Sequence, residues 1–224
     1  MLELLGNSFV IFFVVIDPIG LAPIFMALTP GVSEARRRSM ALRATLLAAI
    51  ILVLFALVGA PLLEALGVGL PAFRIAGGLL LFFLAMDMVF ARHSGMRSPT
   101  ASEEHEAEQR DDISVFPLAF PLIAGPGALT TILLLTGSRE DDPLAFVAVL
   151  AVLLLVLGLA LAALLLAARL MRHLGQTGTN VISRVLGVIL AALATQFVLD
   201  GLREGLFGQP LEDAAYFVLP SGAA

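Results

Sequence analysis

Residues 5–28 read LGNSFVIFFVVIDPIGLAPIFMAL, an apolar run with an aspartate and a proline at its centre. A helix rises 1.5 Å per residue, so a run of this length crosses the roughly 30 Å of hydrocarbon in a bilayer. Lipid offers no partners to backbone polar groups, so each span is expected to be helical. Five further apolar runs of similar length follow, at 41–63, 71–89, 113–135, 144–168 and 185–202. The sequence therefore predicts an all-α, polytopic membrane protein with six transmembrane helices.

The composition excludes several other classes of protein. Of 224 residues, 59% are hydrophobic and 14% are charged, whereas a soluble domain is about 45–50% apolar and about 25% charged. The absence of cysteine excludes a disulfide framework and a thiolate zinc site. No basic patch alternates with aromatic residues, so nucleic acid is not an expected partner. The usual hydrolase and metalloprotease motifs are absent, and we expect no enzyme, no cofactor and no metal site.

The arginines predict the orientation of the chain in the membrane, since it contains no lysine. The loops after the first, third and fifth runs, with their flanks, hold ten arginines: Arg36, Arg37, Arg38, Arg43, Arg92, Arg97, Arg110, Arg169, Arg172 and Arg184. The opposite side holds three, Arg74, Arg139 and Arg203. Basic loops stay in the cytoplasm, so both termini are expected outside a plasma (inner) membrane. Residues 1–8 hold no arginine, so the first run is expected to be a reverse-oriented signal anchor rather than a cleaved signal peptide.

The two halves of the chain resemble each other weakly. Arg74-Ile-Ala-Gly77 recurs as Arg184-Val-Leu-Gly187, and the Asp17-Pro18 break recurs as Gly125-Pro126-Gly127, at separations of 110 and 108 positions. An odd number of spans in each half requires the second half to be inverted, an arrangement typical of secondary transporters. The expected units are residues 1–91, an acidic cytoplasmic loop at 92–112 read as a solvated segment, residues 113–206, and a tail at 207–224. Chance similarity between apolar helices is the alternative.

Both breaks predict a helix that restarts inside the membrane. Proline interrupts a helix but suits its first position, and aspartate is a strong N-cap. Two half-helix N-termini would meet from opposite directions and favour a carboxylate, while Asp17 would favour an ammonium group or a proton. The alternatives are that Asp17 is purely an N-cap and that the second break is a packing kink.

Two other polar side chains lie within the predicted spans. Asp87 is a candidate coupling residue, although an interfacial or salt-bridged role is the stronger reading. Gln196 either lines the site or forms an interhelical hydrogen bond. The candidate substrate-binding residues are therefore Asp17, Pro18, Gly20, Gly125, Pro126, Gly127, Thr130, Thr131 and Gln196, with Asp17 and Asp87 as candidates for ion coupling.

Four segments resemble the MarC family of bacterial inner-membrane proteins. They are Ile16-Asp-Pro-Ile-Gly-Leu-Ala-Pro-Ile24, Phe73-Arg-Ile-Ala-Gly-Gly78, Pro117-Leu-Ala-Phe-Pro-Leu-Ile-Ala-Gly-Pro-Gly-Ala128 and Gln196-Phe-Val-Leu-Asp-Gly201. The resemblance extends from the first span to the sixth, and many members carry asparagine where this chain has Asp17. It implies six spans and a place among neutral amino acid transporters.

Residues and resemblance together predict a secondary transporter of small neutral amino acids such as glycine or alanine, coupled to H⁺ or Na⁺. A channel or facilitator, or a membrane scaffold without transport, is the alternative. The expected partners are the amino acid and the lipid bilayer, and the sequence leaves a homo-oligomer open.

Overall fold

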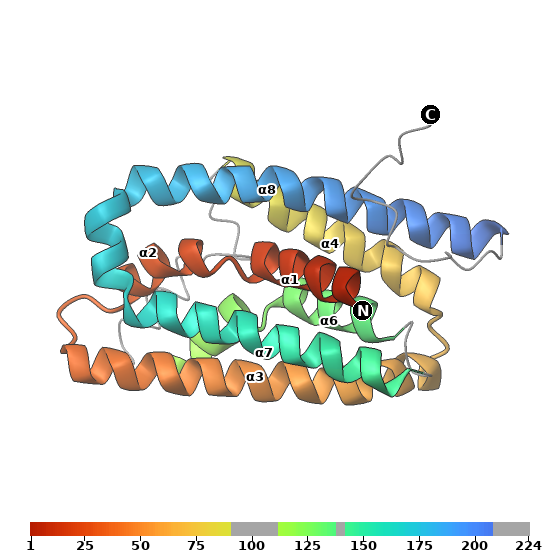
Figure 1. Ribbon diagram of the computed structural model, residues 1–224, viewed down its shortest axis with the longest axis horizontal. Helices are drawn as coiled ribbons and strands as arrows, with labels where there is room; N and C mark the ends of the chain where they lie inside the picture. The colour runs from red at the N-terminus through yellow and green to blue at the C-terminus, as the bar shows by residue number, and fades with distance from the viewer. Residues whose placement is uncertain (91–111, 138–141, 208–224) are drawn as a thin grey trace.

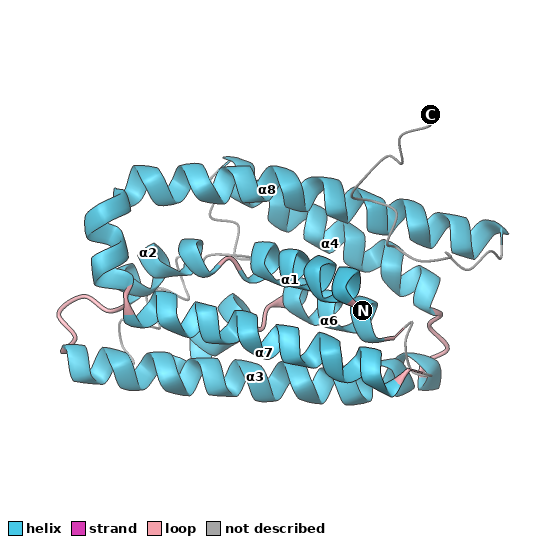
Figure 2. Cartoon of the chain, viewed as in Figure 1, coloured by secondary structure: helices cyan, strands magenta, loops and turns pink. Residues whose placement is uncertain are grey.

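The computed structural model describes residues 1–90, 112–137 and 142–207, and within these ranges all regular structure is helical (Figure 2). The acidic loop at 92–111, Arg139 and the tail at 208–224 lie outside the described residues. The helices are α1 (Leu2–Ile16), α2 (Pro18–Leu28), α3 (Glu34–Ala65), α4 (Leu70–Phe90), η1 (Ser114–Ile123), α6 (Pro126–Thr136), α7 (Pro143–Leu165) and α8 (Ala167–Phe207).

The long helices run side by side along the longest axis of the molecule, and the broken ones lie among them (Figure 1). In this view α1 and α2 follow one another between α8 above and α7 below, and they contact both of those helices. The turns after α2 and α7 lie at one end, while the N-terminus and the turn after α3 lie at the other. This arrangement places both predicted breaks away from the ends of the bundle.

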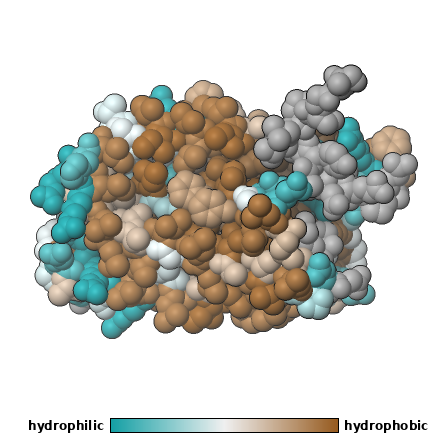
Figure 3. Space-filling view, viewed as in Figure 1, coloured by the Kyte–Doolittle hydropathy of each residue, from teal (hydrophilic) through white to brown (hydrophobic). Residues whose placement is uncertain are grey.

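The described helices are sufficient for a multi-pass membrane protein. Five stretches are long and apolar enough to cross a bilayer, with α1 and α2 together forming one of them, residues 2–28. The pair η1 and α6, bent by 53°, supplies a sixth. A broad apolar surface covers the middle of the face in Figure 3, with hydrophilic residues at both ends. The predicted all-helical membrane protein is confirmed at this level, whereas the inverted repeat stays a prediction.

One expectation about the spans needs correction. The sequence predicts a loop between the fifth and sixth runs, but α8 begins at Ala167 and is interrupted within this segment at Gly175, where φ is +64°. The first half of the fourth span is not an ordinary α-helix, because Phe116 and Phe120 have extended backbones. Both residues precede a proline, and proline pushes its predecessor out of the helical region. Irregular backbone at membrane depth must be covered by protein, and η1 packs against α3.

α4 and α8 form the closest helix pair, and glycines make the approach possible. A Cβ on Gly78 would lie 2.8 Å from the Ala194 carbonyl oxygen, and one on Gly201 would lie 2.8 Å from that of Pro71. Gly187 packs in the same way against Ala85 and Met88. Because the partner positions fall as the α8 numbers rise, the two helices are antiparallel. An ion pair of 2.6 Å between Arg74 and Glu204 joins the beginning of α4 to the last turns of α8.

Candidate functional site

Asp17 forms the first break, and its local geometry is unusual. It ends α1 and caps α2, with φ 44° and ψ 71°, and it is the one non-glycine residue with positive φ in the described part of the chain. Its Oδ1 accepts a hydrogen bond of 3.0 Å from the Gly20 amide, and Pro18 takes the first helical position. The predicted interruption and restart are therefore present. A residue held in this left-handed region costs about 1–3 kcal/mol and is a feature found at functional sites.

The second oxygen of Asp17 is held from a distant part of the chain. Ser183 on α8 donates its hydroxyl to Oδ2 at 2.9 Å, and both side chains are buried. Sequence reasoning missed Ser183, because a contact across 166 positions leaves no local signature. Its spacing of four residues from both Thr179 and Gly187, along one helix face, was the available hint.

The second break has a different construction from the first. Gly125 is extended and precedes α6, and Pro126 takes the first helical position. A Cβ at Gly125 would overlap the Pro121 carbonyl oxygen, so the chain can fold back here only with glycine. Among the residues that the structure describes, no side chain caps α6. The first N–H groups of a helix have no partner within it, so the positive end of α6 lacks the carboxylate that α2 has.

The two breaks meet at one small cavity of about 30 Å³. Val15, Ile16, Asp17 and Leu21 line it from the first break, and Pro121, Leu122, Ile123, Gly125, Gly127 and Ala128 line it from the second, with Leu84 of α4 between them. Gly127 lies close to α4 and α1, since a Cβ there would be 2.8 Å from Leu84 Cδ2 and 3.4 Å from Val15 Cγ1. This volume holds one or two water molecules, far less than the roughly 300–1,000 Å³ of an open ligand pocket.

The other candidate residues lie outside this lining. Thr130 packs its methyl against Gly77 of α4, and Thr131 is buried, with no hydrogen-bond partner for its hydroxyl in the part of the chain that the structure describes. Gln196 donates to Asp200 on its own helix at 2.6 Å. Asp87 is buried in α4. Their proposed roles in binding and coupling stay predictions.

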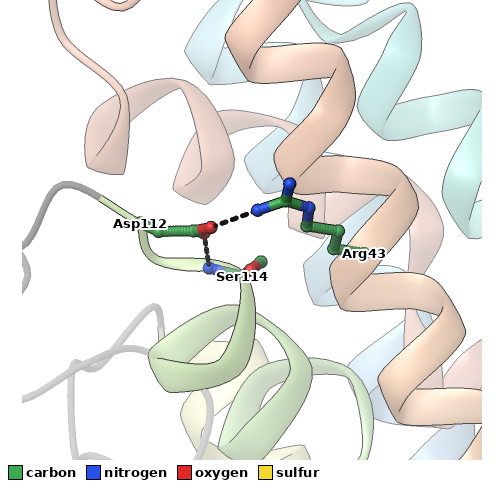
Figure 4. A network of polar contacts seen from close by, with 3 residues as sticks. All are labelled: Arg43, Asp112 and Ser114. Carbon is green, nitrogen blue, oxygen red and sulfur yellow. Dashed lines mark hydrogen bonds and ion pairs between the residues drawn. The ribbon is translucent and has the colours of Figure 1, made fainter.

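A polar network outside the spans fixes the start of η1 (Figure 4). Asp112 accepts hydrogen bonds of 2.9 Å from the Ser114 amide and from Arg43 of α3. Hydrogen bonding from Ser114, followed by that from Arg43 and its charge, lowers the pKa of the Asp112 carboxyl below its ordinary value of 3.8. No group of three or more acidic or histidine side chains gathers as a metal site in the described ranges.

Comparison with known proteins assigns the family. The pattern of the MarC family integral membrane proteins matches residues 2–206. The chain belongs to the MarC family. A UPF0056 membrane protein of Archaeoglobus fulgidus is 36% identical over 204 residues, covering 91% of this chain and 94% of the relative.

Two bacterial relatives are similarly close to this MarC-family chain. The UPF0056 membrane protein YvbG of Bacillus subtilis is 33% identical, covering 92% of this chain and 97% of its own. The UPF0056 membrane protein YhcE of Escherichia coli is 36% identical, and the match covers 89% of this chain and 91% of the relative. No solved structure matches the chain. The family thus extends over bacteria and archaea, and these names specify no substrate.

Proposed function

We propose that this MarC-family chain is a secondary transporter of small zwitterions, most simply neutral amino acids such as glycine or alanine. The observation that carries the proposal is the cavity at the two helix breaks. Asp17 lines it from the first break, and Gly125, Gly127 and Ala128 at the start of α6 line it from the second. Asp17 is an expensive residue to retain within a span, since a carboxylate at mid-membrane costs about 2.5–3.5 kcal/mol.

The chemistry of the two breaks matches the two charges of an amino acid. The ligand carboxylate binds the first-turn amides around Gly127 and Ala128, which have no partner within their own helix and where the helix dipole favours an anion. The ligand ammonium binds the Asp17 carboxylate. The remaining lining is apolar, which suits a short aliphatic side chain and excludes a charged one. Because the cavity holds no more than a water or two, the breaks must separate to admit glycine, and that movement is the conformational step of transport.

The same proposal includes an inverted repeat of residues 1–91 and 113–206. Its support is the antiparallel α4–α8 pair and the meeting of the two breaks at one cavity. The two termini lie outside a plasma membrane by the distribution of arginines. H⁺ or Na⁺ couples through Asp17 or Asp87. The chain acts as a carrier rather than as an enzyme, with the bilayer and the amino acid as its partners.

Counterflow in proteoliposomes tests the proposal. Vesicles containing the protein are preloaded with one unlabelled amino acid, and the uptake of radiolabelled glycine or alanine is followed against empty vesicles. We expect accumulation that depends on the preloaded amino acid, because only an exchanging carrier couples the two fluxes. Downhill flux without counterflow would favour a channel, and no flux together with no ligand-induced thermal shift would favour a scaffold.

Asp17→Asn identifies the site within the same assay. Loss of a charge-assisted contact is worth about 1.5–3 kcal/mol, so alanine counterflow should fall at least about tenfold. Asp200→Asn is the matched control, because Asp200 is also a buried aspartate within a span, but it is bonded along its own helix and lies away from the cavity lining. Equal activity of Asp17→Asn and the wild type would remove Asp17 from the site.

A further inference from the structure

The hydroxyl of Ser183 forms a different bond from those of Thr179 and Thr195 on the same helix. Thr179 donates to the Gly175 carbonyl oxygen at 3.1 Å, and Thr195 donates to that of Ala191 at 2.8 Å. Such bonds to the preceding turn are the ordinary arrangement for serine and threonine in an apolar helix. Ser183 reaches out of its helix to Asp17 Oδ2, although the two residues are 166 positions apart. It is therefore a cross-link between α8 and the first break.

Both oxygens of the Asp17 carboxylate are consequently held in place. Gly20 donates to Oδ1 from within α2, and Ser183 donates to Oδ2 from α8. Two donors from two elements fix the plane of the carboxylate, which a single N-cap bond would leave free to rotate.

We infer that Ser183 is a positioning residue of the proposed amino acid site, acting through Asp17 to set its affinity for the ligand's primary ammonium group. This inference rests on the proposed function. A serine suits the role because it has one short side-chain torsion, so little conformational freedom is lost in holding the donor in place. α8 thereby becomes a third element of the site, beside the two broken helices.

The test compares alanine counterflow by the wild type, Ser183→Ala, Ser183→Thr, Asp17→Asn and the double variant Asp17→Asn/Ser183→Ala. We expect Ser183→Ala to raise the half-saturating alanine concentration about 3–10-fold and to leave the maximal rate within twofold. Ser183→Thr keeps the hydroxyl and should return the half-saturating concentration to within about twofold of the wild type. In the Asp17→Asn background, removal of the hydroxyl should have no further effect, since Ser183 acts through the carboxylate.

Thr195→Ala is the matched control, because it removes a hydroxyl from the same helix that is bonded to its own backbone. The positioning role would be overturned if Thr195→Ala raised the half-saturating alanine concentration as much as Ser183→Ala does. It would also be overturned if the effects of Ser183→Ala and Asp17→Asn were fully additive in the double variant. If the wild type catalyses counterflow and Ser183→Ala has the same half-saturating alanine concentration as the wild type, this inference alone is overturned. A folded wild type without counterflow would overturn the proposed function, and this inference with it.

Discussion

Gly78→Ala is expected to destabilise the α4–α8 pair. The new Cβ would lie 2.8 Å from the Ala194 carbonyl oxygen and 3.0 Å from the Val198 amide nitrogen, both backbone atoms, while ordinary contact begins at 3.4 Å. α8 must therefore move by about 0.6 Å along the whole contact. Overpacking of this kind costs about 1–3 kcal/mol. The higher helix propensity of alanine returns about 1 kcal/mol, which leaves a net loss of about 0–2 kcal/mol.

Gly158→Ala on α7 is the control, because no atom lies within 4 Å of a Cβ added there. Only the propensity gain applies, so this variant should be up to about 1 kcal/mol more stable than the wild type. The difference between the two variants is then about 1–3 kcal/mol, or roughly 2–12 °C in Tm for a chain of this size.

Circular dichroism in detergent micelles is the suitable assay, since the chain has no tryptophan and a single tyrosine to report unfolding by fluorescence. Size-exclusion chromatography of heated samples provides a second measure of the same transition. The reasoning would be refuted if Gly78→Ala unfolded at or above the temperature of Gly158→Ala. Such a result would mean that α4 and α8 do not approach as closely as the structure has them.

Two further predictions concern ion pairs at the ends of the spans. The pair Arg74–Glu204 is half-buried at 2.6 Å, so a double-mutant cycle with alanine should give a coupling of about 0.5–2 kcal/mol by thermal unfolding, and a coupling near zero would contradict it. The lowered pKa of Asp112 means that its bonds to Ser114 and Arg43 contribute stability above about pH 3.8, and that this contribution is lost as pH falls through the lowered pKa. Asp112→Asn should therefore be less stable than the wild type at pH 7, with a difference that shrinks in acid, and a constant difference between pH 7 and pH 2 would contradict the assignment.

The parts of this molecule that follow local rules could be predicted from the sequence. The positions of the spans follow from apolar length, and the restart at Asp17 and Pro18 follows from capping and the missing proline amide. The loosened segment before the second break follows from Pro117 and Pro121, since Phe116 and Phe120, the residues that precede them, have extended backbones.

The remaining features depend on packing between distant segments. The bond between Ser183 and Asp17 joins residues 166 positions apart, and nothing in either neighbourhood specifies the partner. Gln196 was weighed as an interhelical or site residue, but its bond to Asp200 lies within one helix, at a spacing of four that the sequence already shows. The gap between the fifth and sixth apolar runs predicts a loop, whereas α8 occupies this segment with an interruption at Gly175.

The apolar character of most of the cavity lining has a stereochemical consequence. An amino acid bound at its ammonium and carboxylate groups is fixed at two points, and two points do not distinguish mirror images. For alanine, the choice between the L and D forms then falls to whichever hydrocarbon side chain meets the methyl group, with Leu84 and Ile123 among those that face the cavity. Methyl contacts are weak discriminators, worth about 1–3 kcal/mol. A carrier built in this way would be only moderately selective for handedness, and substitutions in the hydrocarbon wall would alter that selectivity without touching a charge.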